Sequence, residues 1–288
     1  MFKLKELFKG FSLRDLALLL IFPTIITLLM FLPEPIRIFM QLNIKNPQWW
    51  QFFTSGFIQQ NWSPHFLGNI LGYFIMVFPV FFLIATRTNK KKYYFYFLTI
   101  ISLTFPLLGS LFQWYFYPNV FTHLVLLTGS SGIIAGLSGL IPAFWILSLA
   151  NKIQLRIKIR FALISIVYLP LSFLFIYSAL LYNLKIFFCV LVFFILLLFS
   201  YRNGILSILL AIGNERKNSI FTTFILILTL TLFLATPSII FPKLSVLSNG
   251  TTLTDFFVHY LGMAYGLIIS FYFFIFINKE TKPLFFNG

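Results

Sequence analysis

Apolar residues along this chain gather into long runs, which short polar and basic segments separate. Eight of these runs approach or exceed the roughly 20 residues that a helix needs to cross a bilayer. Helices satisfy their own backbone polar groups, so the pattern predicts an all-α, polytopic (multi-pass) membrane protein with about eight transmembrane helices. The predicted spans are approximately 15–32, 64–86, 93–112, 130–150, 161–182, 184–200, 219–241 and 256–277.

Charge then orients these spans. Of the 288 residues 60% are hydrophobic and only 9% are charged, yet the formal net charge is +15. The basic residues flank the spans, where they meet the anionic lipid of the bilayer, and this distribution argues against nucleic acid as a partner. With the N-terminus inside, the inner segments hold 17 of the 21 Lys and Arg residues. We therefore expect both termini to be cytoplasmic, in a cell membrane, with an even number of spans.

On this map, a few polar residues share one shallow layer near the outer face. Spans 64–86, 130–150 and 256–277 all run from outside to inside. His65 and Asn69 lie in the first turns of the first of these, Ser131 begins the second, and His259 lies in the first turn of the third. At 1.5 Å per residue, each lies only about 2–8 Å below its helix end. This convergence follows from hydropathy and charge alone.

The spacing of glycines predicts that these helices approach one another closely. Small residues four positions apart allow the backbones of two helices to touch. Such a close approach is required if a serine hydroxyl on one helix is to reach an imidazole on another. A histidine with an ordinary pKa near ~6.5 is mostly neutral at pH 7 and can accept the serine proton. The three glycine pairs are Gly68 and Gly72, Gly132 and Gly136, and Gly262 and Gly266.

These motifs resemble those of the rhomboid intramembrane serine proteases. The GxSG motif of that family matches Gly129–Gly132, its HxxxN motif matches His65–Asn69, and its HxxGxxxG motif matches His259–Gly266. The resemblance implies that Ser131 is the nucleophile and His259 the base. It also implies an oxyanion hole formed by His65, Asn69 and the backbone N–H of Ser131.

The resemblance covers residues 49–150 and 255–277. It implies one rhomboid-like domain over residues 1–288, with a six-helix core and two extra helices within 151–218. Four features depart from the family pattern. Gln51 stands where an Arg usually follows the Trp, Gln59 where a His is usual, and Ala135 where a Tyr commonly supports the histidine ring. In addition, 128 residues separate Ser131 from His259, enough for three intervening spans.

The resulting hypothesis is an intramembrane serine endopeptidase that cleaves transmembrane segments of membrane proteins. No cofactor or metal is expected, because the chain has no HExxH motif and no acidic residue deep within a span. The segment 33–63 is expected to lie partly in the outer interface and to shield the site. Two alternatives remain: a catalytically inactive rhomboid-like pseudoprotease that binds or guides membrane proteins, and, ranked last, a transporter or channel.

Overall fold

A computed structural model describes residues 11–59, 64–87, 91–120, 126–141 and 256–280, with a few further positions between 144 and 231. Most of the predicted spans 161–182, 184–200 and 219–241 lies outside the described residues, as does the region 151–218 expected to hold the extra helices. The number of spans in the whole chain therefore stays a prediction.

Four long helices coincide with predicted spans. They are α2 (Leu13–Met30), α5 (Pro64–Arg87), α6 (Lys91–Val120) and α15 (Phe256–Glu280). Among the described residues, Leu13–Met30 and Lys91–Pro118 are each long and apolar enough to cross a membrane, and shorter apolar stretches lie within α5 and α15. The described part of the chain is thus mostly helical, in agreement with the hydropathy pattern.

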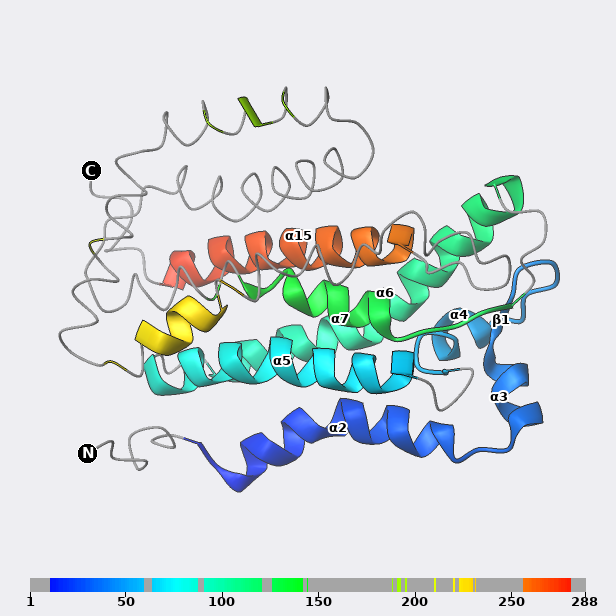
Figure 1. Ribbon diagram of the computed structural model, residues 1–288, viewed down its shortest axis with the longest axis horizontal. Coiled ribbons are helices and arrows are strands. Elements are labelled where there is room, and N and C mark those ends of the chain that lie inside the picture. The colour runs from blue at the N-terminus through cyan, green and yellow to red at the C-terminus, as the bar shows by residue number, and fades with distance from the viewer. Residues whose placement is uncertain are drawn as a thin grey trace.

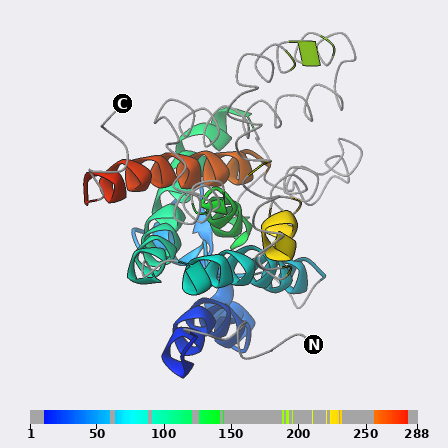
Figure 2. The same ribbon diagram turned by 90° about the vertical axis from the view of Figure 1, so that its left-hand side faces the viewer.

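The helix α7 (Ser131–Ser138) begins where the span 130–150 was predicted and lies at the centre of the described helices. Every residue from Gly132 to Leu140 is buried. Figure 1 shows α5, α7 and α15 running in one direction and α2 and α6 in the other, as the predicted topology requires. In the end-on view of Figure 2, α7 lies between α5 and α15.

The helix α6 is longer than predicted. It has 30 residues and continues to Val120, whereas hydropathy placed the end of the span near residue 112. Its last turns carry Gln113, Trp114 and Tyr115, which are less apolar and lower the mean hydropathy without breaking the helix. A hydropathy window detects the apolar stretch rather than the helix, so it ended the element too early.

The outer segment, which we define as residues 33–59, leads from α2 to α5. It contains α3 (Glu34–Met40), β1 (Leu42–Asn43) and α4 (Gln51–Thr54). Strand β1 pairs antiparallel with β2 (Leu126–Leu127), the segment that leads into α7. The all-α prediction missed this pair, because two residues are too few to show the alternation typical of strands.

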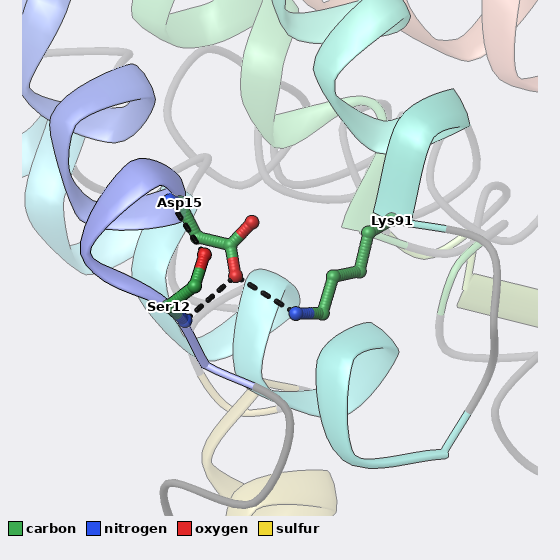
Figure 3. A network of polar contacts seen from close by, with 3 residues as sticks. All are labelled: Ser12, Asp15 and Lys91. Atoms are coloured by element: carbon green, nitrogen blue, oxygen red, sulfur yellow. Dashed lines mark hydrogen bonds and ion pairs between the residues drawn. The ribbon is translucent and has the colours of Figure 1, made fainter.

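A polar network ties α2 to α6 at the opposite end of the bundle (Figure 3). Ser12 and Asp15 form a capping box, in which each side chain accepts a hydrogen bond from the backbone N–H of the other residue. The same Asp15 carboxylate forms an ion pair with Lys91, with 2.8 Å between Nζ and Oδ2. The start of α6 is therefore anchored to the start of α2.

Candidate active site

Helices α7 and α15 touch backbone to backbone through their glycines. A Cβ atom at Gly262 would collide with the carbonyl oxygen of Gly132, and one at Gly266 with the carbonyl oxygen of Gly136. Further along, a Cβ at Gly139 would lie 2.6 Å from the carbonyl oxygen of Met263. No larger residue fits at these three positions unless the helices move apart.

This contact fixes the positions of the predicted catalytic residues along the axes of α7 and α15. His259, Gly262, Gly266 and Ser270 are spaced i, i+3, i+7 and i+11, so they form one stripe along α15. Ser270 marks the inner end of the stripe, where its hydroxyl donates to the carbonyl oxygen of Gly139 over 2.9 Å. His259 continues the stripe one turn beyond Gly262 and is 6% exposed. Ser131 directly precedes Gly132, so Ser131 and His259 both lie within one helical turn of the contact between Gly132 and Gly262, on its outer side.

Helix α5 brings a polar side chain to this level from the other side of α7. Gly72 packs on Ile134, since a Cβ at Gly72 would lie 3.5 Å from Cγ2 of Ile134. Asn69 lies one turn nearer the outer end of α5 and is buried. Its Nδ2 atom has no hydrogen-bond partner among the residues that the structure describes. His65 lies one further turn out, in the first turn of α5, and its side chain is outside the described part of the chain.

The glycine expectation is corrected at Gly68. This residue is exposed, and no described atom lies within 4 Å of the position that its Cβ would take. Asn69 and Gly72 lie on the buried side of α5, whereas Gly68 points away from it. The spacing rule predicted a packing pair here, but only Gly72 of the two packs on a described helix, because residues four apart lie about 6 Å apart along the helix and one contact need not extend that far.

At the start of α7, two backbone N–H groups have no acceptor within the helix itself. Gly129 has a φ of +138°, a conformation that favours glycine, and it turns the chain into the helix. The N–H groups of Ile133 and Ile134 both donate to the carbonyl oxygen of Ser130. The N–H groups of Ser131 and Gly132 lie earlier in the first turn, where a helix offers no acceptor. These two N–H groups lie at the N-terminal end of the helix, which carries a positive partial charge.

The two glutamines that depart from the family pattern both hold the outer segment in place. The side-chain oxygen of Gln51 accepts from the backbone N–H groups of Asn43 and Gln48, and its Nε2 donates to the carbonyl oxygen of Phe39. Gln59 donates from Nε2 to the hydroxyl of Ser130 over 2.9 Å. Sequence reasoning noted both residues only as departures. The sequence did contain a signal for this role, because both residues have uncharged polar side chains in a segment that was expected to pack on the site.

A small cavity lies beside the start of α7. Its volume is about 20 Å³, which is room for one water molecule. Gly129, Ile133 and Val258 form part of its wall, and polar side chains of Ser55, Ser110 and Gln113 line it as well. A polar wall of this kind can hold a water molecule within reach of the first turn of α7.

Ala135 is fully buried and offers no ring for the histidine. An aromatic ring does lie against the start of α7, but it comes from α6. The ring of Phe105 would lie 2.6 Å from a Cβ at Gly132, and its centroid is 6.0 Å from that of Tyr265 on α15. Phe105 therefore fills the space at the junction of α6, α7 and α15, a contact that the sequence did not predict.

A metal site is not apparent in the described part of the chain, where no group of three or more His, Cys, Asp or Glu side chains is placed to hold an ion. The chemistry that these residues offer is instead that of a hydroxyl, an imidazole and neutral hydrogen-bond donors. Such a set suits attack on a carbonyl and stabilisation of the oxyanion that forms.

Comparison with known families bears on the same region. The family model of the Rhomboid domain matches residues 46–186, which include the outer segment from Asn46, α5, α6 and α7 but not α15. No curated protein and no solved structure matches the chain. Rhomboid proteins are embedded in membranes and act on transmembrane proteins; they are generally serine proteases, and the family also includes pseudoproteases. The Ser131 and His65–Asn69 motifs both lie inside the matched residues, and the match supports membership of the rhomboid family.

Proposed function

We propose that this protein is an intramembrane serine endopeptidase that uses a Ser131–His259 dyad to cleave transmembrane segments of membrane proteins. The observation that supports this most directly is the glycine contact between α7 and α15. In support of a dyad, Ser131 and the buried His259, which are 128 residues apart in the chain, each lie within one helical turn of this contact.

In the proposed reaction, the Ser131 hydroxyl attacks the scissile carbonyl carbon and its proton passes to His259. The carbonyl oxygen becomes an oxyanion, which accepts hydrogen bonds from the Ser131 N–H, the Asn69 amide and His65. The C–N bond then breaks, and His259 returns the proton to the leaving amine. An acyl-enzyme remains.

Water must then reach the acyl-enzyme inside an apolar environment. The polar cavity beside Gly129 is a suitable source, because it has room for one water molecule next to the first turn of α7. His259 removes a proton from this water, the resulting hydroxide attacks the ester, and the Ser131 oxygen leaves as a hydroxyl. The dyad is then restored.

Cleavage of a reconstituted transmembrane reporter tests the proposal. Wild-type protein should cleave it, whereas Ser131→Ala and His259→Ala should each lose about 10⁴-fold or more in kcat, the order found when a catalytic nucleophile or base is removed. Both variants should fold, because each truncates a single side chain at the outer helix ends. Unchanged cleavage by Ser131→Ala would overturn the mechanism.

Labelling with a fluorophosphonate separates the enzyme from a rhomboid-like pseudoprotease. The enzyme should be labelled in a way that depends on both Ser131 and His259, since only an activated serine reacts at an appreciable rate. A folded wild-type protein that neither reacts nor cleaves any reporter would instead support a module that binds or guides membrane proteins.

A further inference from the structure

The five residues before Ser131 are all held by the outer segment. Leu126 and Leu127 pair with β1, and the hydroxyl of Thr128 donates to the carbonyl oxygen of Ile58. The N–H of Gly129 donates to the carbonyl oxygen of Ser55, and the hydroxyl of Ser130 accepts from Gln59. The last of these contacts joins two side chains, and it lies directly at the N-cap of α7.

Ser130 does not act as an ordinary helix cap. A serine at the N-cap usually adopts an extended backbone and accepts a hydrogen bond from the second or third N–H of the helix. Ser130 has φ −84° and ψ −4° and makes no such bond. Its hydroxyl oxygen is 2.9 Å from Nε2 of Gln59, and both side chains are buried.

This arrangement matters for the proposed oxyanion hole. The second N–H of α7 belongs to Gly132, which follows the proposed nucleophile. If Ser130 adopted the extended backbone of an ordinary N-cap, its hydroxyl would accept from that N–H or the next one and would occupy the end of α7 where the oxyanion forms. The bond to Gln59 holds the hydroxyl away from this end.

We propose that Gln59 is a positioning residue for the reaction, because it engages the Ser130 hydroxyl and so keeps the first-turn N–H groups of α7 open to the substrate oxyanion. This inference rests on the proposed function. It also concerns residues particular to this chain: a glutamine stands at position 59, where the family usually has histidine, and Ser130 is the variable residue of the GxSG motif.

Two variants test the role of the pair. Gln59→Met keeps the length of the side chain and removes the donor, so the Ser130 hydroxyl becomes free to cap α7. We expect kcat to fall by about 10- to 100-fold with little change in KM, somewhat less than the ~10²–10³-fold loss when an oxyanion-hole donor is removed outright. The double variant Gln59→Met, Ser130→Ala lacks the competing hydroxyl and should recover most of this loss.

A tether with a purely structural role predicts a different pattern. In that case the double variant should be as impaired as Gln59→Met, and this result would overturn the proposal. Thr54→Val is the matched control, because it removes the hydrogen bond from Thr54 to the carbonyl oxygen of Met40 within the same outer segment. It should leave kcat close to the wild-type value even where thermal stability falls.

Hydrogen exchange gives a readout that does not need activity. In Gln59→Met, the peptide that spans the start of α7 should exchange more slowly at Gly132, because the Ser130 hydroxyl now caps that N–H, and the double variant should reverse the change. Exchange that stays equal in all three proteins would overturn the role of Gln59. A wild-type protein without cleavage activity would refute the proposed function instead, and the exchange experiment would still decide whether Gln59 controls the cap.

Discussion

Asn69 combines deep burial with an unused hydrogen-bond donor. A buried amide without a partner costs roughly 1–3 kcal/mol of folding free energy, so folded proteins rarely keep one without a reason. Asn69 is 7% exposed, its Nδ2 atom has no partner among the described residues, and it lies at the level of Ser131. An oxyanion that forms only during the proposed reaction would supply the missing acceptor and would explain why Asn69 is buried at this position.

Replacement of Asn69 by Ala should therefore separate activity from stability. We expect kcat for a transmembrane reporter to fall by about 10²–10³-fold, because one oxyanion donor is lost. The free energy of unfolding should change little, since the Nδ2 atom makes no hydrogen bond to the described residues. Steady-state kinetics and unfolding in detergent measure the two effects.

Ser102 provides the matched control for Asn69. Its hydroxyl is also buried without a partner among the described residues, but it lies on α6 rather than in the candidate site. Ser102→Ala should leave kcat unchanged and should keep or slightly raise stability. An equal loss of kcat in both variants would mean that Asn69 acts through packing and not through its donor.

At the scale of elements, the contact between α7 and α15 depends on residues that lack a Cβ. Replacement of Gly262 by Ala forces a methyl group onto the carbonyl oxygen of Gly132. Neither backbone can yield without separating the helices, so stability should fall by about 1–3 kcal/mol or more. Cleavage should fall more than 10-fold as Ser131 and His259 separate, which kinetics and thermal unfolding can measure together.

The same substitution at Gly68 is the control. Gly68 also lies in a small-xxx-small pair, but it is exposed and its Cβ would meet no described atom. Gly68→Ala should keep stability or raise it by up to about 1 kcal/mol, because Ala has the higher helix propensity, and it should leave cleavage intact. If Gly262→Ala behaved in the same way, the close approach of α7 and α15 would not be what holds the site together.

These elements also show what the sequence could predict. Long apolar runs and flanking charges were sufficient for α2, α5, α6 and α15, and motif spacing was sufficient to select Ser131, Asn69 and His259 as candidates. The outer segment was beyond this reasoning, because its contacts are single hydrogen bonds between residues far apart in the chain. Examples are the Gln59–Ser130 bond and the bond from the Thr128 hydroxyl to the carbonyl oxygen of Ile58.

For the molecule as a whole, the positive-inside rule predicts that the end of the bundle carrying Ser131 faces outward. Single cysteines in a Cys189→Ser background can test this orientation. Trp49 is 81% exposed near the start of α4, and Lys92 is exposed at the start of α6, at the opposite end of the bundle. In intact cells a membrane-impermeant thiol reagent should label Trp49→Cys and spare Lys92→Cys.

Permeabilised cells supply the control for the labelling, since both cysteines should then react. The reverse pattern in intact cells would place the site on the cytoplasmic side. It would also contradict the orientation that was inferred from the distribution of basic residues. The packing of the helices against one another would be unaffected.

The docking of α15 against α7 has a consequence for the time at which the protein becomes active. The proposed nucleophile and the proposed base are 128 residues apart, so at ordinary translation rates the ribosome needs roughly 6–26 s to proceed from one to the other. During that interval α7 can already sit in the bilayer, but the imidazole does not yet exist. Newly made chains would therefore pass through the insertion machinery, among many unfolded transmembrane segments, before they are able to cut any of them.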